Sequence, residues 1–263
     1  MGDDLRRHLR VGFDRAAEDY QRTRPVCPPH LFDDLIRLAA LKAGDRVIEI
    51  GCGTGQATVP LAERGLAITA VELGPELAAI ARRRLAAFLA ATVVTCAFED
   101  WQPPHDALFD AVVAVNSLHW IDPRLRYAKP YGLLRSGGVM AVAGCRWTQV
   151  ADAGRFWTEV QADYRAVGYE GDPPPPPEQI SPWHFPPEAR TLFREVASSR
   201  YPFEVLYTAE EYLAILATQS GTRALGEARS ANFLVRVRRR LESFGWPRLT
   251  ATFVGYLTVG QRM

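Results

Sequence analysis

The sequence has little of what a secreted, membrane-spanning or metal-dependent protein needs. Its four cysteines, Cys27, Cys52, Cys96 and Cys145, form no Cys-x-x-Cys pair, which disfavours a disulfide framework and a zinc site. The five histidines are not clustered at ligand spacings, so we expect no metal. No apolar run approaches the ~20 residues of a membrane span, and the acidic start is unlike a signal peptide. We therefore expect a reduced, cytoplasmic protein whose cysteines are small buried residues.

An excess of charge of either sign is also missing. The chain has 31 basic and 30 acidic residues and a formal net charge of +1, which argues against nucleic acid or an anionic membrane as a partner. Arginine is concentrated at residues 82–84 and 236–240. We expect solvated helix faces there, with an anion site as the alternative. The 263 residues, 48% of them hydrophobic, suffice for one α/β domain with a sizeable insertion.

What the sequence does contain is a glycine-rich turn after a short β-branched run. Residues 47–50 predict a strand, and Gly51, Gly53 and Gly55 predict a turn before a helix. Such a turn brings backbone N–H groups close to a ligand. A dinucleotide site requires Gly-x-Gly-x-x-Gly, and here Gln56 occupies the place of the third glycine. The spacing therefore weakens the case for an NAD-dependent oxidoreductase.

Two acidic residues accompany this turn. Glu49 lies inside the end of the strand, where a carboxylate would repel a pyrophosphate but attract a cationic or amino-bearing ligand. Glu72 ends the next β-prone run, residues 68–72, and at the tip of a neighbouring parallel strand it would accept hydrogen bonds from a ribose diol. The alternative for Glu72 is a charge at the start of the helix that follows.

Strand-like and helical patterns alternate along the first half of the chain. This alternation predicts parallel β-α-β units and a doubly wound sheet. Thr208 begins a pattern typical of a capped helix, and Gly245 ends another helix. The further strands are expected at 93–96, 109–116, 139–143, 200–207 and 250–259, and the helices at 30–41, 56–65, 76–89, 155–167 and 230–244.

Five features occur together in a recognisable order between about residues 12 and 145. They are the turn at 49–55, Glu72, Phe109-Asp110, His119-Trp120 and the turn at 134–138. With these five features in this order, the chain resembles a class I S-adenosylmethionine-dependent methyltransferase of the small-molecule branch. It departs from that branch at Cys27, where a tyrosine is common, and at Cys96-Ala97, where many members carry an aspartate for the adenine amino group.

The resemblance implies a doubly wound, mostly parallel seven-stranded sheet with an antiparallel C-terminal hairpin. It also implies an N-terminal helical cap over residues 1–45, a cofactor-binding core over 46–145 and a substrate-covering insertion over 146–199. Residues 200–263 would supply C-terminal helices and edge strands. We expect these segments to form one compact domain, as a monomer or a homodimer.

The same resemblance assigns the site. It implies S-adenosylmethionine as cofactor, S-adenosylhomocysteine as product, and no metal. The cofactor-binding residues it implies are Tyr20, Arg24, Glu49, Gly51, Cys52, Gly53, Gln56, Glu72, Leu73, Phe98, Glu99 and Asn116. Arg24 would pair with the donor's carboxylate, and Glu99 or backbone groups near Phe98 would contact the adenine.

Two residues are the candidates for catalysis. His119 follows the strand whose tip would face the methyl group, so it is the leading general base; its alternative is to fix the loop together with Trp120. Tyr20 would close over the donor. His184, between two aromatic residues, is a weaker base candidate than His119, and a surface histidine is the alternative.

The expected reaction is in-line displacement, with methyl transfer to an oxygen, carbon or nitrogen of a small metabolite. Seven aromatic residues between 147 and 185 suggest an apolar or aromatic acceptor, and packing of the insertion is the alternative. A nucleic-acid or protein methyltransferase is disfavoured by the charge and by residues 116–119, Asn-Ser-Leu-His, where amino-methylating enzymes carry Asn/Asp-Pro-Pro-aromatic. A non-methylating S-adenosylmethionine-binding protein or cyclase on the same fold stays open.

Overall fold

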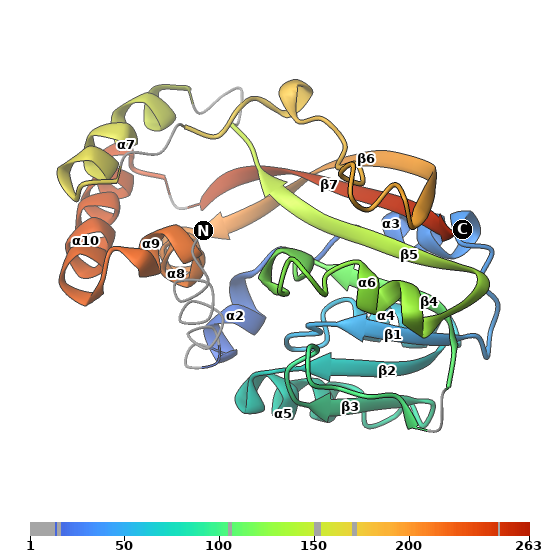
Figure 1. The fold of residues 1–263 in the computed structure, drawn as a ribbon. Helices are drawn as coiled ribbons and strands as arrows, with labels where there is room; N and C mark the ends of the chain where they lie inside the picture. The colour runs from blue at the N-terminus through green and yellow to red at the C-terminus, as the bar shows by residue number, and fades with distance from the viewer. Residues whose placement is uncertain (1–13, 15–16, 105–106, 150–153, 170–172, 247) are drawn as a thin grey trace. The chain divides into compact units, whose positions relative to one another are not determined.

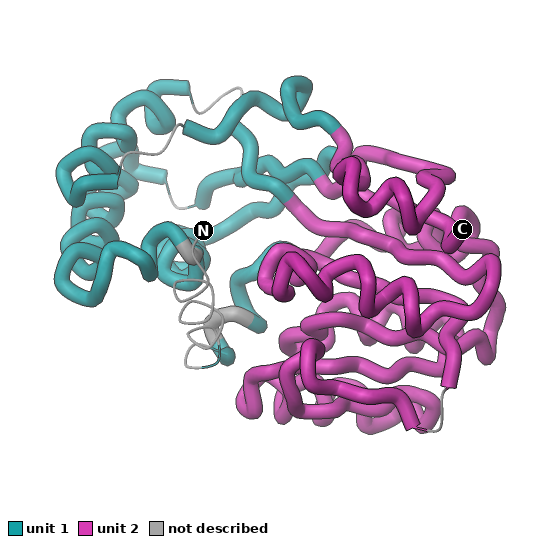
Figure 2. Tube along the Cα trace, in the orientation of Figure 1, with its two compact units in different colours: residues 1–25, 146–181, 202–254 teal, residues 26–145, 182–201, 255–263 magenta. Residues whose placement is uncertain are grey.

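The computed structural model describes residues 14, 17–104, 107–149, 154–169, 173–246 and 248–263. The chain divides into two compact units, drawn in different colours in Figure 2. Unit 1 comprises residues 1–25, 146–181 and 202–254, and unit 2 comprises residues 26–145, 182–201 and 255–263. The segments 146–199 and 200–263 of the sequence analysis therefore each contribute residues to both units.

A seven-stranded sheet has the order β3-β2-β1-β4-β5-β7-β6 (Figure 1). Its strands are β1 Arg46–Ile50, β2 Ala67–Glu72, β3 Ala91–Thr95, β4 Phe109–Val115, β5 Leu134–Trp147, β6 Phe193–Thr208 and β7 Arg248–Arg262. The first five pair in parallel, and the last two form the antiparallel C-terminal hairpin at one edge. The predicted fold class is confirmed.

In unit 2, the helix α3 Pro29–Leu38 precedes β1. Short helices follow between the strands: α4 Thr58–Glu63, α5 Pro75–Arg84, the 3-10 helix η3 Leu118–Trp120 and α6 Ala128–Leu133. The predicted helix 76–89 was too long, since residues 85–90 have to reverse the chain into β3. Ile68 N–H in β2 already donates to the carbonyl of Ala90 at 2.8 Å. The helix predicted from 56 begins only at Thr58, because the glycine turn extends to residue 57.

The core of unit 2 lies on both faces of its part of the sheet. Val47 packs in one cluster with Leu31, Leu35 and Leu61, whereas the next residue, Ile48, packs in the other. Successive strand residues point to opposite faces, so a strand covered on both sides must be apolar throughout. This explains why β1 reads as a continuous apolar run interrupted only by Glu49.

Unit 1 has its own aromatic core. Its helices are α2 Ala17–Thr23, α7 Gly154–Ala166, the 3-10 helix η5 Pro177–Gln179, α8 Ala209–Thr218, α9 Ser220–Ala224 and α10 Glu227–Phe244. Thr208 and Glu211 form the expected capping box of α8, and Gly245 ends α10 with φ 63°. In the described residues, no helix is both long and apolar enough to cross a membrane.

Candidate functional site

The glycine turn lies at the carboxyl end of β1 and requires its glycines. Gly51, Gly53 and Gly55 have φ of 64°, 57° and 79°, a region that L side chains enter only at a cost. A Cβ on Gly51 would also lie 2.8 Å from Cβ of Ser117. The N–H groups of Gly51 and Cys52 donate to the carbonyl of Val71, at 2.8 and 3.2 Å, which holds the turn against β2.

Glu72 at the end of β2 supports this turn. One carboxylate oxygen accepts a hydrogen bond from the N–H of Gly53 at 2.8 Å, and the other accepts one from the N–H of Gly74 at 2.8 Å. Gly74 is the N-cap residue of α5. Glu72 therefore lies at the start of a helix, which was the alternative to ribose binding. It also fixes the glycine turn.

Glu49 is a carboxyl group buried within β1, with 1% of its surface exposed. Burial raises the pKa of Glu49 to about 7; the carboxylate of Glu72 adds to the rise and the hydroxyl of Thr58 opposes it. Its Oε2 atom has no hydrogen-bond partner among the described residues. A buried, unpartnered carboxyl oxygen is costly in the absence of a ligand, so it marks a place that favours a cation or a hydrogen-bond donor.

The carboxyl end of β4 is fixed to both neighbouring strands. Ser117 Oγ donates to the carbonyl of Ile50, and Asn116 Oδ1 accepts from the N–H of Cys145 at 2.9 Å. Asn116 has φ 55°, which asparagine tolerates better than most residues. A Cβ on Gly144 would collide with Asn116 Oδ1. Sequence reasoning missed Ser117; the signal available was a small residue just after the strand that neighbours the turn.

His119 lies in η3, directly after this end of β4, and its side chain is exposed. Its ring lies 4.6 Å from that of Trp120, with an interplanar angle of 46°, and Arg126 donates to its carbonyl oxygen at 3.0 Å. The contact with Trp120 fits the alternative of a loop-fixing residue, and the exposure leaves the ring accessible to a substrate.

Comparison with known proteins identifies the part of the chain that holds these strand ends. Residues 47–138 match the family described as Methyltransferase domain. These residues form a methyltransferase domain. The matched residues run from β1 to the beginning of β5, so they contain the glycine turn, Glu72 and the end of β4.

Individual relatives agree with this assignment. An uncharacterized methyltransferase of Mycobacterium tuberculosis is 33% identical over 168 residues, which are 64% of this chain and 63% of the relative, so the match spans less than two thirds of either protein. Malonyl-acyl-carrier-protein O-methyltransferase of Salmonella typhimurium is 26% identical over 91% of this chain and 89% of its own. A solved structure of a candidate type II methyltransferase from Anaeromyxobacter dehalogenans has the same fold, with a TM-score of 0.61 and 23% identity. The match covers 91% of this chain and 97% of that protein.

Other residues predicted to bind the cofactor lie around the same strand ends of the methyltransferase domain. Gln56 and Leu73 are half-buried beside the turn, and Cys52 is buried in it. Phe98 is buried in the core with Lys129 Nζ 5.1 Å from its ring centre. Glu99 Oε1 accepts from the N–H of Asp122 at 3.2 Å. The side chain of Phe98 is thus a packing residue, and only its backbone remains as an adenine contact.

The two N-terminal candidates belong to unit 1. The backbone of Tyr20 lies in α2, and its side chain lies outside the described part of the structure. Arg24 donates from Nε to Thr218 Oγ1 at 3.1 Å and from Nη2 to the carbonyl of Thr218 at 2.7 Å. These bonds join the segment after α2 to the end of α8. A cofactor role for Tyr20 and Arg24 stays a prediction.

His184 is engaged outside this site. Its Nδ1 lies 2.7 Å from Glu195 Oε1 in β6, and the other oxygen of Glu195 accepts from the N–H of Phe185 at 3.2 Å. The pair of His184 and Glu195 therefore holds the segment before β6. Among the described residues, no three potential metal ligands lie together.

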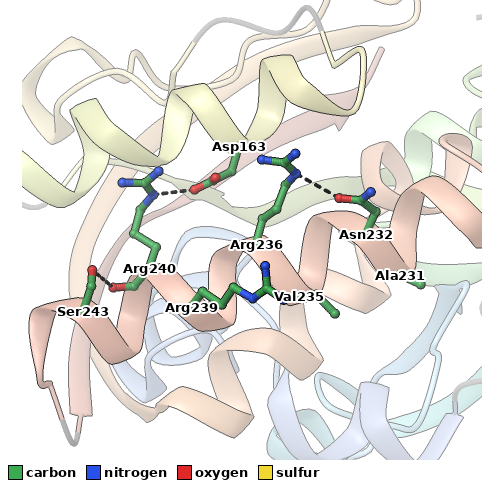
Figure 3. A pocket seen from close by; sticks show the side chains of 8 residues that line it. All are labelled: Asp163, Ala231, Asn232, Val235, Arg236, Arg239, Arg240 and Ser243. Carbon is green, nitrogen blue, oxygen red and sulfur yellow. Dashed lines mark hydrogen bonds and ion pairs between the residues drawn. The ribbon is translucent and has the colours of Figure 1, made fainter.

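Unit 1 contains a surface cavity of about 650 Å³ along α10 (Figure 3). Its lining residues are Asp163, Ala231, Asn232, Val235, Arg236, Arg239, Arg240 and Ser243. Arg240 binds the buried carboxylate of Asp163 and, at 2.9 Å, Glu159, while Arg238 pairs with Glu210. Part of the arginine run thus clamps α10 to α7 and α8, and no residue predicted for cofactor binding lines the cavity.

The aromatic residues of the expected insertion are used in packing. Phe156 and Trp157 are buried in the core of unit 1, and Trp147, Tyr164 and Tyr169 pack against it. Phe185 is buried in unit 2 with Trp183 packed beside it. This is the alternative that the sequence left open, so aromatic content does not indicate an aromatic acceptor.

Proposed function

We propose that this protein transfers the methyl group of S-adenosylmethionine to an oxygen, carbon or nitrogen of a small metabolite. One observation carries the proposal: the glycine turn, anchored by Glu72, lies beside the unpartnered buried carboxyl of Glu49. The usual methyl donor of this family is S-adenosylmethionine, which bears a sulfonium and an amino group. A cationic ligand would satisfy Glu49 Oε2, the carboxyl oxygen that has no hydrogen-bond partner among the described residues.

The residues at the strand ends fit this donor chemically. The positive φ angles of Gly51, Gly53 and Gly55 belong to residues without side chains, so a ligand can approach the backbone of the turn closely. Glu72 holds the turn, and a carboxylate oxygen can accept more than one hydrogen bond, so this group fits hydroxyl donors chemically. The proposed cofactor-binding set also contains Cys52, Gln56, Leu73, Glu99, Asn116 and the backbone near Phe98.

When bound, the donor supplies an activated methyl group, so the protein has chiefly to orient the acceptor and exclude water. Ser117 and Asn116 hold the end of β4 rigidly against β1 and β5. The exposed imidazole of His119 follows two residues later, and its ring nitrogen would take the proton from an acceptor that does not lose it readily.

The acceptor is proposed as a small molecule. The near-neutral charge gives no general attraction to nucleic acid. An apolar or aromatic acceptor, expected from residues 147–185, stays a proposal, and the aromatic side chains that pack the two cores give it no added support. The Salmonella relative is named for a malonyl-acyl-carrier protein, so carboxylic acids and their thioesters belong in the first acceptor screen.

Calorimetry with the unmodified protein tests the proposal. We expect saturable binding of S-adenosylmethionine and S-adenosylhomocysteine, and none of NADH. The binding should be lost in Gly53→Val and weakened at least tenfold in Glu72→Gln, whereas Glu76→Gln, on the exposed first turn of α5, should bind normally. No binding to the unmodified protein contradicts the proposal. Binding without a methylated product in a mass-spectrometric screen favours the non-methylating alternative.

A further inference from the structure

Two cysteines far apart in the sequence lie in direct contact within unit 2. Sγ of Cys27 and Sγ of Cys145 are 3.0 Å apart, although 118 positions separate the residues. That distance is shorter than the ~3.5–4.0 Å of ordinary non-bonded heavy-atom contact, and only roughly 1 Å longer than a disulfide bond. Cys52 and Cys96 make no such contact among the described residues.

The pair lies at the places where the chain changes units. Cys27 is the second residue after the chain enters unit 2, and Cys145 is the last residue before it leaves for unit 1. The segment between them contains the whole methyltransferase match, residues 47–138. The backbone around Cys145 is fixed, since its N–H donates to Asn116 Oδ1 at 2.9 Å and Gly144 leaves no room for a Cβ.

We propose that Cys27 and Cys145 form a reversible disulfide when the protein meets hydrogen peroxide. The thiolate of one cysteine of the pair attacks one peroxide oxygen, the O–O bond breaks, and that cysteine becomes a sulfenic acid with release of hydroxide, which is protonated to water. The sulfur of the other cysteine then attacks the sulfenic sulfur and expels a second water as the S–S bond forms. Two thiols and one peroxide give one disulfide and two waters, and a dithiol reductant reverses the reaction.

The contact leaves the order of these steps open between the two cysteines. The hydrogen bond to Cys27, together with burial, raises the pKa of Cys145 well above the ordinary thiol value. Either sulfur can be the donor in their hydrogen bond, so one cysteine serves as the first nucleophile and the other as the resolving thiol. Cys27 is itself buried, with 5% exposed, which favours a small oxidant over a bulky disulfide.

The bond has a measurable consequence for stability. It closes a loop that holds the complete methyltransferase domain, and a long closed loop restricts the unfolded chain more than a short one does. Oxidation should therefore raise the melting temperature by several degrees, and dithiothreitol should restore the original value. This readout requires neither the cofactor nor the acceptor, so it stands or fails independently of the proposed function.

Peptide mapping of the full-length protein tests the proposal. The reduced protein is treated with hydrogen peroxide, free thiols are alkylated, and a digest without reductant is examined by mass spectrometry. We expect a Cys27–Cys145 cross-linked peptide, alkylated Cys52 and Cys96, and an intact mass lower by two hydrogens before alkylation. Four alkylated cysteines, another linkage, or sulfinic acids without a cross-link would overturn it.

Matched variants separate the pair from general thiol oxidation. Cys52→Ser and Cys96→Ser should keep both the cross-link and the shift in melting temperature. Cys27→Ser and Cys145→Ala should each lose both the cross-link and the shift in melting temperature. If one of these variants fails to fold, the other one tests the proposal. If the shift persists in a folded variant that lacks either thiol, the disulfide is not its cause.

Discussion

Glu72 Oε2 accepts a hydrogen bond from the backbone N–H of Gly53 at 2.8 Å. A carboxylate at the end of one parallel strand thus holds the ligand-binding turn of its neighbour. Because the other oxygen holds the start of α5, the loss of Glu72 would loosen two loops at once. Glu72→Gln, which keeps one acceptor oxygen, is therefore a sharper test of donor binding than Glu72→Ala.

Glu49→Gln should stabilise the protein while weakening its binding of the donor. The folded-state pKa of Glu49, about 7, lies above the ordinary value of 4.5, so between these pH values the folded state binds more protons. The free energy of unfolding contributed by this group therefore falls as pH rises from 4.5 to 7, by roughly 3 kcal/mol. Above pH 7, the free energy of unfolding of the Glu49→Gln variant should therefore exceed that of the unmodified protein by about 1–3 kcal/mol.

The same change should lower affinity for S-adenosylmethionine at least tenfold, about 1.4 kcal/mol. Denaturant titrations from pH 5 to 8 and calorimetry measure both effects. Calorimetry in buffers of different ionisation enthalpy should also show proton release on binding near pH 6.5, because a cationic ligand lowers the pKa of Glu49. A destabilised Gln variant with unchanged affinity would contradict the role given to this carboxyl.

Asp110→Asn is the matched control at the opposite end of the strands. Burial acts to raise the pKa of Asp110, but hydrogen bonds from Arg135 and the N–H of Arg46 outweigh it and hold the pKa below 3.8. The stability that this carboxylate contributes is present above pH 3.8 and is lost as pH falls through its folded pKa. At pH 7 we expect a loss of about 1–2 kcal/mol, measured by denaturation, and unchanged donor affinity.

Gly51→Ala should be more harmful than Gly44→Ala. Both glycines have positive φ, 64° and 86°, so both substitutions incur about 1 kcal/mol of backbone strain. Only at Gly51 would the new Cβ meet another atom, at 2.8 Å from Ser117, and at Gly44 nothing lies within 4 Å. Thermal melts should show the larger loss at Gly51, and calorimetry should show lost donor binding there alone. Equal effects would contradict the requirement for a close approach at Gly51.

His119→Ala should lower turnover far more than it lowers donor affinity. A ring nitrogen that takes a proton in the reaction contributes about 10²–10⁴ to the rate, whereas a ring that only contacts Trp120 contributes to stability. The rate should follow the titration of an imidazole in the unmodified enzyme and lose that dependence in the variant. His184→Ala, which breaks a pair with Glu195, is the control with normal turnover. Unchanged turnover in His119→Ala would make His119 structural.

Arg240→Ala should destabilise unit 1, and Arg239→Ala should not. Arg240 binds Glu159 at 2.9 Å and Asp163, and Asp163 is only 5% exposed. Removing the guanidinium leaves a buried carboxylate without its partner, at a cost of about 2–3 kcal/mol. Arg239 has no ion pair among the described residues. Denaturant titration of the two variants distinguishes a structural arginine from a solvated one.

Most strand positions could be predicted from the sequence, because β1 and β4 are short, apolar and bounded by turn residues. The capping box at Thr208 and the left-handed Gly245 were likewise predicted and confirmed, since both depend on local chemistry. Helix ends were less accurate: α5 ends at Arg84 although its helical pattern continues to residue 89. There the path into β3, and not local propensity, decides where the helix stops.

The sequence by itself determined the fold and the location of the ligand-binding turn. Glycines with positive φ, a preceding strand and an acid at the next strand end are local patterns with a local physical cause. Only the tertiary structure decided what those residues contact: that Glu72 anchors Gly53, that Glu49 is buried with one oxygen unpartnered, and that Cys27 meets Cys145. Burial and long-range contacts depend on how distant segments pack, and that packing sets both the raised pKa of Glu49 and the proximity of two thiols that the sequence places far apart.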